Sequence, residues 1–383
     1  MSVHTTDRPA SDQRATPTWR VRAAVAADVS ALVALEQACF DSDRLSRRRF
    51  RYMLERAHAA LLVAEDAGRV DGYALVLFRQ GTSLARLYSL AVSPARRGAG
   101  LGRALLHAAQ AAATQRDCAY LRLEVRRENA PAVALYRAEG YRPLTVVDDY
   151  YEDGADALRM EKALAPPLAR ARRRVPYYAQ TLDFTCGPAA LMMAMRALRP
   201  RTRLTRSLEL RLWREATTIF MASGHGGCGP FGLALAAARR GFRAEVFVND
   251  HAVPLIDSVR SPEKKAVMRL VHEDMLAEIG ERAVPVCYES LPTEDLEARF
   301  AAGAVPLVLI TSYHLYDEKV PHWVVVTGFA EHFVYVHDPW VEEALGGGAV
   351  DSADMPIARS DFSRMARFGR AGLQAVVLVS AAD

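Results

Sequence analysis

Apolar and polar residues alternate along the first part of the chain with two different periods. Alternation with a period of two indicates strands, and apolar residues three and four apart indicate helices. The patterns predict strands at 19–25, 84–94 and 119–128 and a pair within 60–80, and helices at 28–40, 46–57, 130–141 and after the glycines of 96–102. Because strands and helices alternate, we expect an α/β or α+β sheet domain.

The clearest break in this pattern is the segment ALAPPLARARRRVPYY at 163–178, where prolines, small residues and arginines replace the apolar periodicity. Such a composition is typical of a linker. We therefore expect four parts: a disordered tail at 1–17, a first domain at 18–164, a linker at 165–175 and a second domain at 176–383.

Helices precede strands in the second domain. Apolar runs follow two Cys-Gly-Pro motifs, at 186–188 and 228–230, and predict a helix that begins at each motif. Residues 261–302 have a mainly helical pattern. Short runs rich in β-branched residues predict strands at 243–250, 305–313, 322–329, 332–339 and 372–380. This order predicts an α+β domain.

Composition narrows the class of protein. The 383 residues carry a net charge of only +4, and 51% of them are hydrophobic, which is typical of soluble globular proteins. No apolar run has the length of a membrane span, and the N-terminal residues lack the apolar core of a signal peptide. The five cysteines are widely spaced, so we expect reduced thiols in a cytoplasmic protein, with no disulfide framework and no metal site.

A glycine-rich run, Arg97-Gly98-Ala99-Gly100-Leu101-Gly102, follows a predicted strand and opens a predicted helix. Glycines allow a ligand to approach the backbone closely, and the unpaired N–H groups at a helix start attract an anion such as a pyrophosphate. A dinucleotide fold would need an acidic residue at the end of the next strand, and Glu124 falls in the middle of that strand.

The wider pattern resembles the GNAT acetyltransferases and, within them, the ribosomal-protein-alanine (RimI-like) type. The segments that carry the resemblance are LAVSPARRGAGLGRALL, LRLEVRRENAPAVALYRAEGY and YYEDGADALRMEK, and it covers residues 18–164. The resemblance implies the GNAT fold, acetyl-CoA as cofactor and, as acceptor, a peptide or protein with a free N-terminal amine.

The same resemblance implies a role for each matched residue. Glu124 would be the general base that deprotonates the attacking amine through water, and Tyr136 the general acid for the departing CoA thiolate. Backbone N–H groups of the glycine-rich run would bind the pyrophosphate, the strand before it would hold the pantetheine arm, and an amide would bind the cofactor from the next helix. The implied cofactor-binding residues are Leu90, Val92, Arg97, Gly98, Gly100, Gly102, Arg103 and Asn129.

The second domain contains the residue types of a thiol-protease-type site. A nucleophilic cysteine needs a base, a group that orients the base and donors for the oxyanion. Cys186 begins a predicted helix, whose N-terminus favours the thiolate, and Gln180 lies six residues earlier as an oxyanion donor. His322 opens one predicted strand and Asp338 ends the next, so neighbouring antiparallel strands would place imidazole and carboxylate side by side.

Cys228 lies in the second Cys-Gly-Pro motif and is the alternative nucleophile. A helix start alone does not distinguish the two cysteines, but Ala222, six residues before Cys228, has no side-chain donor. We therefore predict that Cys186 is the nucleophile and that Cys228 is a packing residue.

The ordered set of Gln180, TCGPAAL, PHWVVVTGF and VHDP resembles the papain-like clan and, more closely, peptidase family C39, over residues 175–383. This implies a papain-like fold and peptide cleavage by a Cys-His-Asp site. The chain departs from the usual members, which are joined to transporter spans and an ATPase and often have Asp where Thr185 stands. A peptidase, an acyl or amide transferase that uses the same cysteine, and a non-catalytic peptide-binding domain all stay open.

The leading hypothesis is a bifunctional enzyme that acetylates and cleaves peptides. Its main alternative is an acetyltransferase whose second domain only binds a peptide or protein. Arginines at 170 and 172–174 leave a ribosome-associated role open, although nucleic acid is not an expected partner. The sequence makes no prediction about oligomeric state.

Overall fold

The computed structural model describes residues 19–164, 171–172, 174–217, 226–316, 318–341 and 351–382. The expected tail at 1–17 and most of the expected linker lie outside the described residues. The chain divides into two compact units: unit 1 is Met1–Phe78 with Ala85–Leu164, and unit 2 is Arg79–Leu84 with Ala165–Asp383. The segment Arg79–Leu84, which the sequence placed within the first domain, therefore belongs to unit 2.

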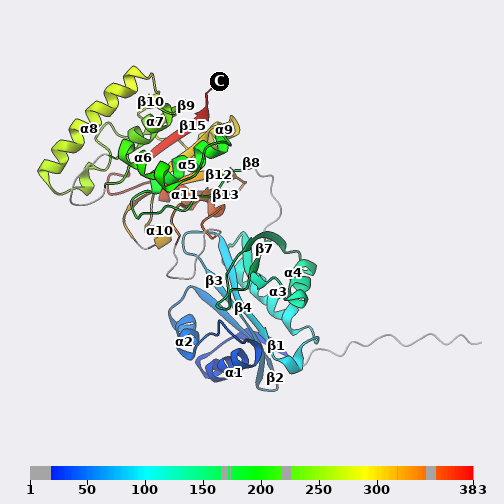
Figure 1. The fold of residues 1–383 in the computed structure, drawn as a ribbon. Helices are drawn as coiled ribbons and strands as arrows, with labels where there is room; N and C mark the ends of the chain where they lie inside the picture. The colour runs from blue at the N-terminus through cyan, green and yellow to red at the C-terminus, as the bar shows by residue number, and fades with distance from the viewer. Residues whose placement is uncertain are drawn as a thin grey trace, which may run out of the picture. The chain divides into compact units, whose positions relative to one another are not determined.

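Unit 1 is a seven-stranded sheet in the order β1-β2-β3-β4-β5-β7-β6, with helices on both faces (Figure 1). Its strands are β1 (Arg20–Ala23), β2 (Ala59–Asp66), β3 (Arg69–Phe78), β4 (Leu84–Val92), β5 (Tyr120–Arg126), β6 (Arg142–Val147) and β7 (Ala157–Ala163). Its α-helices are α1 (Val29–Cys39), α2 (Arg47–Glu55), α3 (Leu101–Thr114) and α4 (Ala130–Ala138). Each strand and helix predicted here is present.

Two apolar cores hold unit 1 together, one on each face of its sheet. Leu105 and Leu106 of α3 pack with Val133 of α4 against one face. Leu32 of α1 and Phe50 of α2 pack against the other. These helices bury an apolar stripe and expose their polar side, as the period of the sequence predicted.

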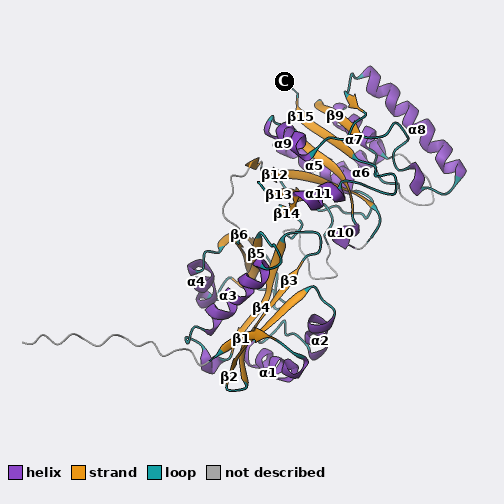
Figure 2. Ribbon diagram, turned by 180° about the vertical axis from the view of Figure 1, so that it is seen from behind, coloured by secondary structure: helices purple, strands orange, loops and turns teal. Residues whose placement is uncertain are grey.

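Unit 2 is built on an eight-stranded sheet, in which β10-β9-β15-β11-β12-β13-β14 are neighbours and β8 pairs with β12 (Figure 2). The strands are β8 (Ala171–Arg172), β9 (Phe242–Val248), β10 (Val286–Cys287), β11 (Val305–Thr311), β12 (Pro321–Phe329), β13 (Phe333–His337), β14 (Met355–Ala358) and β15 (Ala375–Ala381). The α-helices are α5 (Cys186–Leu198), α6 (Arg206–Ala216), α7 (Pro230–Ala238), α8 (Pro262–Glu281), α9 (Thr293–Ala301), α10 (Tyr313–Tyr316) and α11 (Arg359–Met365).

Both faces of this sheet are covered as well. Apolar residues of α5, α6, α7 and α8 pack on one face, and those of α9 and α11 pack on the other. The predicted strands at 305–313, 322–329 and 332–339 are confirmed as β11, β12 and β13. The two mixed α/β units confirm the predicted fold class. Within the described ranges, no helix combines the length and the apolar character needed to cross a bilayer.

Several elements of unit 2 differ from the sequence prediction. The helical stretch 261–302 is two helices with the short strand β10 between them, and β8, α6, α10, β14 and α11 had no prediction. Pro356 within β14 weakened the strand signal, because proline lacks the N–H of a ladder and is confined to edge strands. The helix predicted at the second Cys-Gly-Pro motif is confirmed as α7, which begins at Pro230 of that motif, so Cys228 precedes the helix.

Candidate active sites

Cys186 is the first residue of α5 and is 7% exposed. Its sulfur shares a hydrogen bond with the His322 side chain, and the backbone N–H groups of Gly187 and Trp323 also donate to it. Burial by itself would raise the pKa of the thiol, but the charge of His322 and these hydrogen bonds outweigh burial and lower the pKa. The site therefore stabilises the thiolate of Cys186 more than the surroundings of an ordinary cysteine do.

His322 lies near the start of β12, and Asp338 directly follows β13. The antiparallel register pairs Val325 with His337, which brings the two side chains together at one end of the strand pair. The His322 Nε2–H group donates to Asp338 Oδ1 at 2.6 Å. Nε2 is thus engaged by the carboxylate, and Nδ1 is the ring nitrogen left for the Cys186 sulfur.

The protonation of His322 depends on its two anionic neighbours. Burial favours the neutral ring, but Asp338 and Cys186 both favour the imidazolium, and the pKa of His322 is raised to about 10. Burial would likewise raise the pKa of Asp338, but His322 and neighbouring donors lower it. The buried site thus favours a thiolate, an imidazolium and a carboxylate in a row.

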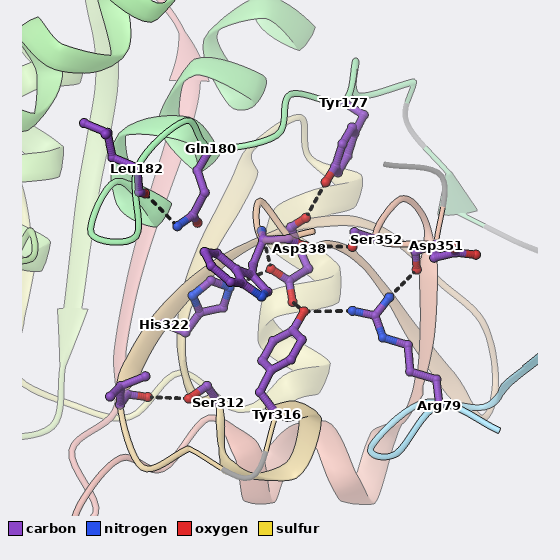
Figure 3. A network of polar contacts seen from close by, with 12 residues as sticks. Arg79, Tyr177, Gln180, Leu182, Ser312, Tyr316, His322, Asp338, Asp351 and Ser352 are labelled. Atoms are coloured by element: carbon purple, nitrogen blue, oxygen red, sulfur yellow. Dashed lines mark hydrogen bonds and ion pairs between the residues drawn. The ribbon is translucent and has the colours of Figure 1, made fainter. Parts of the chain in front are cut away.

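Asp338 is fully buried and accepts from several donors (Figure 3). The Tyr316 hydroxyl donates to Oδ2 at 2.5 Å, and the Trp340 backbone N–H donates to Oδ1 at 2.8 Å. The Tyr177 hydroxyl donates to the Asp338 backbone carbonyl at 2.9 Å. These bonds hold the carboxylate in one orientation toward the ring of His322.

Gln180 is held beside the same strand end. Its backbone N–H donates to the Pro339 carbonyl at 2.8 Å, and its Nε2 donates to the Leu182 carbonyl at 2.9 Å (Figure 3). One Nε2 hydrogen remains, and Oε1 is buried with no partner among the described residues. The side chain thus keeps polar capacity for a group that enters the site.

Glu209 of α6 supports the loop before Cys186, and sequence reasoning missed it. The buried carboxylate accepts from the Thr181 backbone N–H, the Thr181 and Thr185 hydroxyls and the Tyr178 hydroxyl. The signal available in the sequence was a lone acidic residue on the apolar side of a helix. Thr185 suits this site, because an aspartate there would place two carboxylates together.

His337 and Cys228 lie outside this arrangement. His337 donates to the Val175 carbonyl and accepts from the Asp354 backbone N–H, each at 2.8 Å, so both ring nitrogens have structural partners. Cys228 pairs with Thr217 in an isolated bridge and is 2% exposed. Burial and the nearby Cys186 raise the pKa of the Cys228 thiol well above its usual range.

The glycine-rich run of unit 1 forms an exposed turn before α3. Gly98 and Gly100 have φ values of +80° and +87°, and a Cβ at either position would meet nothing within 4 Å. Ala104 N–H donates to the Gly100 carbonyl, so the N–H groups of residues 101–103 precede the helical ladder. Open space and unpaired N–H groups fit the pyrophosphate of acetyl-CoA.

The other predicted cofactor-binding residues lie on β4, in the turn itself, on α3 and at the start of α4. Leu90 and Val92 end β4, and an irregular register with β3 lies just before them. Asn129 caps α4 by accepting from Ala132 N–H, which leaves its amide N–H₂ group available. The Arg103 side chain donates to Glu139 at 2.8 Å, and Arg97 interacts with the Cys39 thiol.

Glu124 and Tyr136 lie on β5 and α4. Glu124 Oε2 accepts from Arg86 at 2.8 Å and Oε1 accepts from Arg159. A carboxylate has about four lone-pair sites, so each oxygen can still accept from a water. Burial raises the pKa of Tyr136 to about 12, which keeps its phenol protonated.

Two family models match the chain. The Acetyltransferase (GNAT) family matches residues 29–141, and the Peptidase_C39 like family matches residues 175–380, more than half of the chain.

Relatives match unit 1. An N-alpha-acetyltransferase of Sulfurisphaera tokodaii is 34% identical over 122 residues, which is 29% of this chain and 73% of that protein. The ribosomal protein bS18-alanine N-acetyltransferase of Escherichia coli is 43% identical over 67 residues, 18% of this chain and 45% of that protein. The crystal structure of the Escherichia coli ribosomal-protein-S18-alanine N-acetyltransferase is 28% identical, with a TM-score of 0.36, and the match covers 39% of this chain and 95% of that one.

Proposed function

Because the chain belongs to the GNAT acetyltransferase family in its first unit and to the Peptidase_C39 like family in its second, we propose that it is a bifunctional enzyme. Unit 1 is an N-acetyltransferase that uses acetyl-CoA. We propose that its acceptor is the N-terminal amine of a peptide or protein, and that unit 2 cleaves peptides with Cys186.

The proposed chemistry of unit 1 uses the glycine-rich turn together with Glu124 of β5 and Tyr136 of α4. Acetyl-CoA supplies the acetyl thioester, and the N–H groups after Gly100 bind its pyrophosphate. Glu124 accepts the proton of the attacking amine through a water on one of its free lone pairs. Tyr136 donates its proton to the departing sulfur, which its burial and raised pKa of about 12 allow, since the phenol remains protonated at neutral pH.

The proposed acceptor is supported by the relatives of unit 1. One is named as an N-alpha-acetyltransferase and another as an alanine N-acetyltransferase of a ribosomal protein. Both names describe acetylation at a protein N-terminus. We propose the same class of acceptor, the N-terminal amine of a peptide or protein, for this chain.

The observation that carries the proposal for unit 2 is the Cys186–His322–Asp338 arrangement. Thiolate and imidazolium stabilise each other, which lowers the pKa of Cys186 and, together with the charge of Asp338, raises the pKa of His322. A structural cysteine in an apolar site has the opposite shift.

The proposed cleavage runs in two steps. The Cys186 thiolate attacks the peptide carbonyl, the C–N bond breaks, and the His322 imidazolium gives its proton to the leaving amine. Water then attacks the acyl-enzyme while His322 accepts its proton, and the carboxylic acid product leaves. The Cys186 backbone N–H at the start of α5 and the remaining Gln180 Nε2 hydrogen are the proposed donors to the oxyanion.

A second function of unit 2 uses the same first step. An amine in place of water would accept the acyl group, which makes the unit an acyl or amide transferase. The Gln180 Oε1 atom, which has no partner among the described residues, can accept a hydrogen bond from the N–H group of an entering amine, and this favours the alternative. Product analysis with and without added amines separates the two.

A peptide library tests the proposal directly. The protein is incubated with acetyl-CoA and peptides, and mass spectrometry measures acetylated and cleaved products together. We expect Glu124→Gln to lower acetylation only and Cys186→Ala to abolish cleavage only. Cleavage that persists in Cys186→Ala, or acetylation that is unchanged in Glu124→Gln, would contradict the assigned roles. Acetylation without any cleavage would support a second unit that only binds.

A further inference from the structure

We propose that Arg79 is a positioning residue for the cysteine site, acting through Tyr316 on the Asp338 carboxylate. This inference deepens the proposed peptidase function and depends on it for the cleavage readout. Arg79 lies in the segment Arg79–Leu84, which belongs to unit 2 although most of that unit follows much later in the sequence.

Three consecutive hydrogen bonds link Arg79 to His322 (Figure 3). Arg79 Nη2 donates to the Tyr316 hydroxyl at 2.7 Å, and that hydroxyl donates to Asp338 Oδ2 at 2.5 Å. Asp338 Oδ1 accepts from His322 Nε2 at 2.6 Å. The direction of donation is fixed at both ends, because a guanidinium can only donate and a carboxylate can only accept. Tyr316 must therefore point its hydroxyl hydrogen at Asp338.

The second arm of the guanidinium fixes where Arg79 lies. Arg79 Nη1 donates to the Asp351 backbone carbonyl at 2.7 Å, next to Ser352. The Ser352 carbonyl accepts from the Asp338 backbone N–H at 2.8 Å. The two arms of the Arg79 guanidinium thus contact Tyr316 and Asp351. Tyr316 donates to the Asp338 carboxylate, and Ser352, the residue after Asp351, accepts from the Asp338 backbone. A lysine lacks this two-armed geometry and would make one of the two bonds.

The turn that carries Arg79 is closely packed in unit 2. Ser83 N–H donates to the Pro356 carbonyl at 2.8 Å. Gly81 has a φ of +70°, and a Cβ there would lie 2.4 Å from the His314 backbone oxygen, so only glycine fits. The position of Arg79 is therefore set by backbone contacts and not by its side chain alone.

Electrostatics points the same way. The titratable and charged groups around Asp338 are His322, Tyr316, Tyr177, Arg79 and Asp351. Burial raises the pKa of Asp338, His322 lowers it, and the positive charge of Arg79 lowers it further. Without Arg79 the pKa of Asp338 rises. When the solution is acidified, the carboxylate therefore becomes protonated at a higher pH than in the wild type.

The test uses the full chain and four variants, Arg79→Gln, Arg79→Lys, Tyr316→Phe and the double variant Arg79→Gln/Tyr316→Phe. Arg20→Gln is the matched control, because the Arg20 side chain is 75% exposed. We expect Arg79→Gln to lower kcat/KM for peptide cleavage roughly tenfold, which is the size of a lost charge-assisted hydrogen bond, and to shift the acid limb of the pH profile upward. Arg79→Lys should recover part of this loss.

The double variant tests whether Arg79 acts through Tyr316. If it does, the double variant loses no more than the larger single loss, whereas independent residues give losses that multiply. Gly81→Ala should reproduce the effect of Arg79→Gln, because it displaces the turn and leaves the guanidinium intact. Multiplying losses, or an Arg79→Gln profile that matches Arg20→Gln at every pH, would overturn the inference.

A second readout keeps this test separate from the proposed function. The rate of Cys186 alkylation by iodoacetamide depends on the thiolate and needs no peptide substrate. If no peptide is cleaved but Arg79→Gln still moves the acid limb of alkylation to higher pH, the positioning role stands and the peptidase proposal fails. If the alkylation profile does not move, the positioning role fails.

Discussion

The two Cys-Gly-Pro segments of unit 2 have the same local sequence and opposite chemistry. Cys186 is the first residue of α5 and has a lowered pKa, whereas Cys228 lies two residues before α7 and has a raised pKa. Both thiols are buried, with exposures of 7% and 2%. Burial therefore does not separate them. The His322 imidazolium, which contacts only the first sulfur, reverses the effect of burial.

The backbone before each cysteine explains why the helices begin at different positions. Thr185 closes a turn by donating its backbone N–H to the Leu182 carbonyl, and α5 starts at the next residue. Cys228 instead bridges to Thr217, and the extended Gly229 is the N-cap of α7. Proline at the first helical position is favoured, as at Pro230. Tertiary contacts thus decide which register the motif takes.

The strongest test of the comparison removes the imidazole. His322→Ala should leave Cys186 with burial but no cation, so its pKa should rise and the thiol should become like Cys228. We expect a loss of about 10³-fold in kcat for cleavage, since general acid–base catalysis contributes on this scale. The measurement is steady-state cleavage of a peptide substrate.

Cys228→Ala is the matched control, and we expect it to change kcat by less than about threefold, because burial and the nearby Cys186 raise the pKa of its thiol and keep it unreactive. If Cys228→Ala were as inactive as His322→Ala, the assignment of the nucleophile would be wrong.

Glu209 provides the next test, because it supports only the segment before Cys186. Glu209→Ala leaves the donors from Tyr178, Thr181 and Thr185 without their acceptor, which should destabilise unit 2 by about 3 kcal/mol. Urea unfolding followed by tryptophan fluorescence measures this, because Trp213, Trp323 and Trp340 all lie in unit 2.

Glu209→Gln keeps one oxygen acceptor and should lose less stability than Glu209→Ala. Equal urea midpoints for the wild type and Glu209→Ala would show that this network does not hold the segment.

A smaller effect on peptide cleavage is expected when the pH is raised. The folded pKa of His322 is raised to about 10, above its ordinary value of 6.5, so the imidazolium is present below that pH and is lost as pH rises through about 10. Cleavage should therefore persist into alkaline solution and fall near pH 10. Asp338→Asn removes the largest favourable cause and should move this alkaline limb toward neutral pH. The pH dependence of kcat/KM checks both, and an unshifted limb in Asp338→Asn would count against the ion pair.

The sequence predicted what depends on local pattern and order. The β-branched runs at 305–339 became β11, β12 and β13, and their pairing brought His322 and Asp338 together as expected. Arg79, Tyr316 and Glu209 were missed for a common physical reason. Each acts through a partner far away in the sequence, and each is of a residue type that is ordinary on a helix or in a turn. No periodicity distinguishes such a residue before the chain folds.

The catalytic and cofactor-binding roles of the unit 1 residues remain predictions. The glycine turn, Asn129 and Tyr136 have geometry that suits the proposed functions, but Glu124 is engaged by Arg86 and Arg159 on both oxygens. The spacing of twelve residues between Glu124 and Tyr136 could not predict that two guanidinium groups bind this carboxylate. The comparison of Glu124→Gln with wild type therefore tests whether the carboxylate moves a proton or only orients its neighbours.

The central claim is that His322 activates Cys186 and no other thiol of the chain. Limiting iodoacetamide at pH 6, followed by peptide mapping, measures the labelling rate of Cys39, Cys118, Cys186, Cys228 and Cys287 in one sample. Burial raises the pKa of the other four, to about 11 for Cys118, so Cys186 should be labelled first. His322→Ala should remove this preference. Equal, slow labelling of all five thiols in the wild-type protein would contradict the account.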